Sequence, residues 1–246
     1  QTANTTTGAI STTTTPAILN GGSDIYVATV QGDLDFVKLE AWYLGAQETF
    51  NSYTLAATSN LDLAENAKIG LEARYVNLKL KQDAANGIAD AVQGNLVPTV
   101  TDAETKNDMF RLAVDGKFSI VNARLAYTKT GKNGGLTALD QDAKNTSLGW
   151  AITSNGAADA NYFQAALGAD ILDNLNFTAH YGNLKTDLDN SDFDFKLQEV
   201  YGQLTYKMSK NLTTYLRYGT YEEKEVKSGD KEQDQTRGRI QVAYTF

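Results

Sequence analysis

The chain has 246 residues, no cysteine, two prolines and 20 glycines, and its formal net charge is −8 at pH 7. The lack of cysteine excludes a thiol nucleophile, a cysteine-ligated zinc site and an iron–sulfur cluster. The acidic balance argues against a nucleic-acid partner, because surfaces that bind nucleic acid are basic. No stretch of about 18 apolar residues is present, which excludes a transmembrane helix. A membrane β-strand needs no such stretch, since only alternate residues face lipid.

Residues 1–23 are rich in threonine, and we predict a loop or arm there. From residue 24 onward, about eleven segments alternate apolar and polar side chains with the period of two that marks a β-strand. The expected strands lie around residues 24–31, 37–43, 52–58, 68–75, 110–114, 121–127, 163–167, 175–181, 199–206, 212–218 and 239–246.

In most of these segments the last residue on the apolar face is a tyrosine, and the last segment also ends on phenylalanine. The tyrosines are Tyr43, Tyr75, Tyr127, Tyr181, Tyr206, Tyr218 and Tyr244. A bilayer interface favours a ring with an apolar body and a wet hydroxyl, whereas the buried face of a soluble sandwich does not. Tyr244 and Phe246 are the expected C-terminal signal for the barrel assembly machinery.

The connections alternate in length. Short ones are predicted at 32–33, 115–117, 170–174 and 208–211, and long polar ones near 82–107, 130–161, 184–192 and 222–236. Outer-membrane barrels have short periplasmic turns and long outer loops. The sequence therefore predicts an all-β fold, a transmembrane antiparallel β-barrel of the porin type, with about 11–12 strands in a single domain 1–246. Residues 146–152 are placed in an outer loop that can fold into the lumen.

Counting back from a periplasmic C-terminus puts the first strand's start at the outer face, which is anomalous for a single-chain barrel with an even number of strands. One hypothesis is that the chain is the C-terminal portion of a larger barrel, with residues 5–20 as an outer loop. The other is a complete 12-stranded barrel with a disordered N-terminal arm.

The polar face of the strands carries charges, which favours a water-filled lumen over a packed core. The expected pore-lining residues are Lys38, Glu40, Glu72, Arg74, Arg111, Arg124, His180, Glu199, Arg217, Arg237 and Arg239. This basic wall could face acidic loops and set a field across the pore. Alternatively, the inward arginines and glutamates merely pair across strands.

The sequence gives little support to catalysis. His180 is the only histidine, and no serine, aspartate or second histidine stands at a spacing typical of a triad or metal site. We therefore expect no enzyme and no cofactor. Clustered loop acids, including Asp140, Asp142, Asp187 and Asp189, could hold calcium, but their spacing matches no EF-hand, and no ligand set is assigned.

Four segments, Leu125–Gly135, Leu148–Trp150, Asp170–Leu175 and Val242–Phe246, resemble the major outer-membrane porins of epsilonproteobacteria. These are relatives of the substrate-selective porins of pseudomonads. The resemblance covers roughly residues 118–246. It implies an 18-stranded barrel, commonly trimeric, with passive diffusion of small hydrophilic solutes. About seven N-terminal strands would then be absent from this chain.

The sequence thus predicts a porin in the outer membrane of a Gram-negative bacterium. Its partners would be outer-membrane lipid, lipopolysaccharide and two further copies in a homotrimer, with no nucleic acid. A second hypothesis is an adhesin or structural barrel whose loops bind surfaces while no pore is open. A third is a secreted soluble β protein.

Overall fold

A computed structural model describes residues 2–3, 10–11, 24–92, 101–138, 144–188 and 194–245. Eleven strands form one antiparallel sheet in which each strand pairs with its neighbours in the chain. These strands are β3 Ile25–Asp33, β4 Lys38–Ala46, β5 Phe50–Ala64, β6 Ala67–Leu80, β7 Lys106–Phe118, β8 Val121–Thr130, β9 Ala160–Leu172, β10 Leu175–Thr186, β11 Phe195–Lys207, β12 Leu212–Glu225 and β13 Lys231–Tyr244. A separate two-stranded ladder joins β1 Thr2–Ala3 to β2 Ile10–Ser11.

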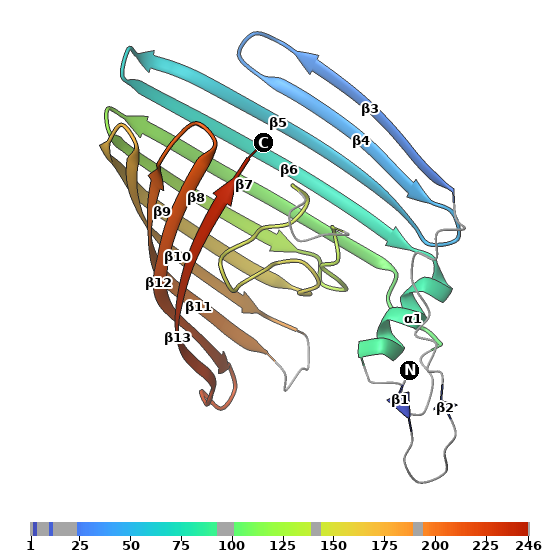
Figure 1. Cartoon of the computed structure of the whole chain (residues 1–246). Helices are drawn as coiled ribbons and strands as arrows, with labels where there is room; N and C mark the ends of the chain where they lie inside the picture. The colour runs from blue at the N-terminus through green and yellow to red at the C-terminus, as the bar shows by residue number, and fades with distance from the viewer. Residues whose placement is uncertain are drawn as a thin grey trace.

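The sheet curls around an inner space, as Figure 1 shows, so that it has a concave and a convex face. Tight turns join the strands at one end of the sheet, the end near the C-terminus: 34–37, 65–66, 119–120, 173–174 and 208–211. The longer connections join the strands at the opposite end. The outermost strands β3 and β13 do not pair with each other, so the described residues form an open sheet. The predicted antiparallel all-β sheet of about eleven strands is confirmed.

Apolar side chains cover the convex face instead of meeting in a central core. Leu125 and Leu216 are 53% and 48% exposed, and Val242 is 63% exposed. Many side chains of the concave face are polar, and some of these are buried. Thr128 in β8 is fully buried, and Arg74 in β6 is 5% exposed. This is the reverse of a soluble sandwich, in which the apolar face would be the buried one.

Aromatic rings gather at one level of the convex face. Tyr43 and Tyr53 are directly opposite each other in β4 and β5, with ring centroids 5.1 Å apart. Further along the sheet, Tyr75 pairs with Phe110, and Tyr127 pairs with Phe163. Pairs of rings repeated across the sheet in this way are typical of a membrane–water interface.

Two small hydrophobic cores lie at the end of the sheet where the longer connections join the strands. In the first, the helix α1 Gln82–Val92 packs Ala85 and Ile88 against Phe50 and Leu78 at the ends of β5 and β6. In the second, Ile152 from the β8–β9 connection packs among strand residues. No helix in the described ranges is long and apolar enough to cross a membrane.

Several predicted connections differ from the structure. Residues 115–117 belong to β7, because Gly116 pairs with Ile69 and Ala123 as an ordinary strand residue, and the chain turns at 119–120. The strands β3 and β9 likewise continue to Asp33 and Leu172, so their turns are 34–37 and 173–174. Glycine and aspartate favour turns, but pairing with a neighbouring strand overrides that preference.

The long connection predicted near 82–107 is confirmed, because β6 ends at Leu80 and β7 begins at Lys106, but it contains α1, which the period-two search could not find. One long loop was predicted wrongly. The region 222–236 is mostly strand, since β12 runs to Glu225 and β13 begins at Lys231. Backbone pairing continues between the two strands there, and Lys231 forms a salt bridge with Glu222 across them at 2.6 Å. The predicted loop near 184–192 starts later, because β10 continues to Thr186. The Thr-rich segment 5–20 lies almost wholly outside the described residues.

Candidate functional site

The strand register places all eleven predicted pore-lining residues on the concave face. Glu72, Arg74, Arg111, Arg124 and Glu199 lie in its central part, where a loop covers them. This loop is the β8–β9 loop, residues 131–159, of which 131–138 and 144–159 are described. Figure 1 shows it in the inner space of the curled sheet, away from the outer ends of the strands. The placement agrees with the expectation that residues 146–152 fold inward.

Glu72 is the centre of a cluster of arginines. Its Oε1 accepts hydrogen bonds from Arg111 Nη2 at 2.6 Å and Arg74 Nε at 3.3 Å, and its Oε2 lies 3.4 Å from Arg124 Nη2. Arg124 Nη1 also bonds Asp115 at 2.5 Å. Three arginines therefore face two carboxylates, which leaves the cluster one positive charge in excess. Cross-strand pairing, one of the two readings left open by the sequence, accounts for these residues.

Arg111 also holds the β8–β9 loop. Its Nη1 donates to the carbonyl oxygen of Thr146 at 2.7 Å and to Ser147 Oγ at 3.3 Å, and its Nη2 donates to the carbonyl oxygen of Lys144 at 2.8 Å. The guanidinium group offers several donors in one plane, so a single side chain joins Glu72 on the wall to the loop backbone.

Polar side chains of three further strands fix the same part of the loop. Thr128 Oγ1 lies 2.6 Å from Ser147 Oγ, and Gln164 Nε2 donates to the carbonyl oxygen of Leu148 at 2.8 Å. At the other side, Asn145 Nδ2 donates to Thr54 Oγ1 at 2.8 Å. The loop thus crosses the concave face from β5 to β9.

The loop then reaches β11 and β12. The backbone N–H groups of Trp150 and Ala151 donate to the carboxylate of Glu199 at 3.0 and 2.7 Å. The Trp150 ring packs edge-on against Tyr201 with centroids 5.4 Å apart, and the Arg217 guanidinium lies 5.3 Å from the Trp150 ring centroid. The loop and the wall therefore meet in a contact between aromatic rings and a cation.

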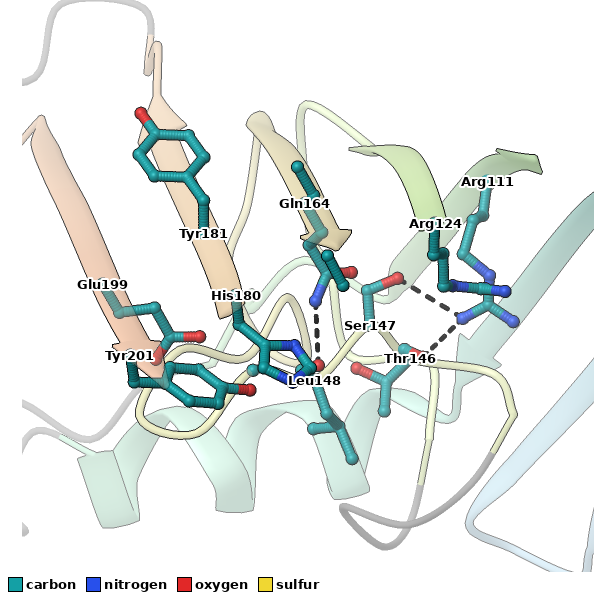
Figure 2. A pocket seen from close by; sticks show the side chains of 13 residues that line it. Arg111, Arg124, Thr146, Ser147, Leu148, Gln164, His180, Tyr181, Glu199 and Tyr201 are labelled. Atoms are coloured by element: carbon teal, nitrogen blue, oxygen red, sulfur yellow. Dashed lines mark hydrogen bonds between the residues drawn. The ribbon is translucent and has the colours of Figure 1, made fainter. Parts of the chain in front are cut away.

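A cavity of about 290 Å³ lies between the loop and the wall. Figure 2 shows Arg111 and Arg124 on one side of it and His180, Glu199 and Tyr201 on the other. The His180 ring stacks on Tyr201 with centroids 4.5 Å apart and planes inclined by 14°. The cavity is lined by both signs of charge, Arg111 and Arg124 facing Glu199, which suits water and hydrophilic solutes.

The remaining predicted residues lie away from this cavity. Lys38 forms a salt bridge with Asp33 at 3.5 Å near a tight turn, and Glu40 accepts a bond from the Trp42 indole at 3.0 Å. Arg237 and Arg239 lie on β13, the edge strand. Tyr244 ends β13 and is exposed, and Phe246 lies outside the described residues.

Sequence reasoning missed the uncharged anchors of the loop: Thr54, Thr128, Ser147 and Gln164. The sequence showed that the strand residues Thr54, Thr128 and Gln164 face inward. It did not show which atoms of the loop they would contact.

The calcium prediction remains untested. In the described part of the chain, no group of three or more histidine, aspartate or glutamate side chains is placed to hold a metal ion. Of the named acids only Asp187 is described, while Asp140, Asp142 and Asp189 lie outside the described residues.

No protein-family model and no curated protein matches the chain. Solved structures do match. OpdL of Pseudomonas aeruginosa has a TM-score of 0.70 at 15% identity over 91% of this chain, and OccAB3 of Acinetobacter baumannii has 0.69 at 17% over 90%. The outer membrane protein OprD of P. aeruginosa has 0.66 at 16% over 90%. The chain spans 61%, 55% and 58% of these three proteins, respectively. It therefore shares their fold over nine-tenths of its own length and covers little more than half of theirs.

Proposed function

We propose that this chain forms most of the wall of a porin in the outer membrane of a Gram-negative bacterium. Small hydrophilic solutes and ions would cross it by passive diffusion. The observation that carries the proposal is the opposite chemistry of the two faces. The convex face exposes apolar and aromatic side chains, whereas the concave face carries charges and an inward-folded polar loop. Lipid outside and water inside require that arrangement.

Closure of the sheet is part of the proposal. In a bilayer every backbone polar group needs a partner, so the free edges of β3 and β13 must be paired in the working protein. We propose that further strands complete an 18-stranded barrel of the kind implied by the epsilonproteobacterial porins, with this chain as the C-terminal portion. The partial coverage of OpdL and OprD supports this. Intact-mass measurement of the native protein tests it, and a native 246-residue chain that forms pores without added strands would contradict it.

Conductance of the native protein in planar lipid bilayers tests the function. A water-filled lumen predicts stepwise, ohmic currents in a simple salt solution. Absence of current from protein shown to be folded would instead support the adhesin or structural barrel. Solubility without detergent would support the secreted β protein.

The assembly is also proposed and rests on the resemblance alone. The native protein would be a homotrimer in contact with outer-membrane lipid and lipopolysaccharide, inserted through its C-terminal strand by the barrel assembly machinery. Chemical crosslinking in intact outer membranes tests the trimer. If the gel shows the monomer and no crosslinked dimer or trimer, the homotrimer is excluded.

A further inference from the structure

The carboxylate of Glu199 has unusual surroundings for a charged group. Its residue is 3% exposed, and within the described ranges it forms no salt bridge. Its partners are two successive backbone N–H groups, those of Trp150 and Ala151, one on each carboxylate oxygen. A buried carboxylate needs donors, and these come from the tip of the β8–β9 loop, residues 148–152.

Two glycines make room for the close contact between the loop tip and the Glu199 side chain. A Cβ atom at Gly149 would overlap the Glu199 carboxylate and the Tyr162 hydroxyl. A Cβ at Gly182, next to Glu199 across β10 and β11, would crowd the Glu199 side chain at 3.0 Å. The loop tip and the wall are therefore as close as backbone and side chain permit.

The hydrogen bonds to Glu199 also decide where the Trp150 ring lies. Because the backbone N–H of Trp150 is bonded to Glu199, the Trp150 ring packs against Tyr201 and Arg217. Arg217 in turn donates to Gln203 Oε1 at 2.9 Å through Nε. Arg111 holds the loop only at residues 144–147, on the other side of the cavity. Gln164 holds Leu148, and Ile152 is buried in the second core, so without Glu199 residues 149–151 could move between these two attachments.

We propose that Glu199 is the positioning residue of the β8–β9 loop, which narrows the proposed channel. It fixes the loop tip on the wall and thereby sets the size of the opening and the place of Trp150 beside Arg217. This inference rests on the proposed porin function. It predicts that loss of the carboxylate changes how steadily the channel conducts, even when the barrel stays folded.

The test variant is Glu199→Gln in the native protein. Glutamine has one acceptor oxygen, so one of the two loop N–H groups loses its partner and meets an N–H donor. Because a hydrogen bond to a charged group is lost, we expect brief closures and open-channel noise events to become roughly tenfold more frequent. The matched control is Glu232→Gln, which removes the same charge from an exposed position on β13.

A spectroscopic measurement separates loop position from conduction. The chain has two tryptophans, so Trp42→Phe leaves Trp150 as the single reporter. In that background Glu199→Gln should raise acrylamide quenching of Trp150 and shift its emission to the red, while the Glu232→Gln control should not. Gly149→Ala should act in the same direction, because its Cβ displaces the tip. Gly116→Ala, whose Cβ would meet nothing within 4 Å, is its control.

The outcomes are distinguishable. If the unmutated protein conducts but Glu199→Gln matches its control in both closures and quenching, the positioning role is wrong. If the unmutated folded protein does not conduct, the porin function is wrong, and the quenching data alone decide whether Glu199 holds the loop. Heat-modifiable migration on gels identifies variants that fail to fold, and Gly149→Ala then supplies the second test.

Discussion

At the scale of single residues, the concave face shows how a few polar side chains hold a loop inside a wide sheet. Glu72 joins three arginines, and one of them, Arg111, joins the wall to the loop backbone. The side chains of Arg74, Arg111 and Glu72 are 5%, 10% and 16% exposed, so these contacts are shielded from solvent. Shielded networks lose more when one member is removed than surface pairs do.

Replacing Glu72 with glutamine should therefore destabilise the protein. Arg74, Arg111 and Arg124 would repel one another with only Asp115 left to offset them. We expect a loss of roughly 1.5–3 kcal/mol, the range for hydrogen bonds to charged groups, in the free energy of unfolding measured by urea titration in detergent. The control Asp62→Asn removes the exposed salt bridge to Lys68 and should have little effect. Equal effects of both changes would refute the role given to Glu72.

Arg111→Lys keeps the charge but not the fork of donors. A lysine ammonium cannot reach Glu72 and the two loop carbonyls together, so residues 144–147 should be held less tightly, by Thr54 and Thr128. Limited trypsin digestion measures this, because cleavage after Lys144 should become faster. Arg237→Lys should leave the cleavage rate unchanged, because among the described residues that side chain bonds only Gln235 and stacks over Tyr221.

At the scale of elements, alternation along each strand is the main determinant of the fold. Leu125 lies outward and Asn122 inward on the same strand, β8, only three residues apart. In the proposed membrane, Leu125→Lys places an ammonium group in hydrocarbon and should cost roughly 2–4 kcal/mol near the midplane. Asn122→Lys should cost far less, because its side chain faces water. Folding titrations into lipid vesicles compare the two, and similar costs would contradict the assignment of the faces.

This alternation also explains how much the sequence could predict. The strand count, the parity of Glu72, Arg124 and Arg217, and the placement of residues 146–152 in a loop followed from period two and from turn polarity. The inward fold of that loop was only one option. The helix α1 did not, since a strand search has no signal for it.

Contacts between distant segments were beyond the sequence. The carboxylate of Glu199 meets backbone N–H groups of Trp150 and Ala151, which carry no side-chain signature. The extended hairpin after Glu222 was missed because its charged residues look like a solvated loop until cross-strand pairing is known.

At the scale of the whole molecule, the balance of charges along the concave face should set ion selectivity. The positive charge of Arg124 is offset by Asp115 and Glu72. Arg217, by contrast, makes no salt bridge among the described residues and lies 4.9 Å from the Tyr201 ring centroid. An uncompensated cation contributes more to the potential inside a pore than a paired one.

Arg217→Glu should therefore shift the reversal potential towards cation selectivity in a salt gradient, and Arg124→Glu should shift it less. The second variant also leaves three carboxylates together and should lower stability. Bilayer recordings under one salt gradient compare both with the unmutated protein. No shift for either variant would place these side chains outside the permeation path.

The hairpin of β12 and β13 extends well past the aromatic row. Tyr218 marks that row on β12, and the strand continues to Glu225, seven residues or roughly 20 Å further. Paired strands resist bending, so the turn at Lys227–Gly229, with Gly229 at φ 76°, lies well beyond the level of the aromatic row. A peptide epitope inserted there would be presented to antibodies on living cells, giving a direct way to count and track the protein without disturbing its interior.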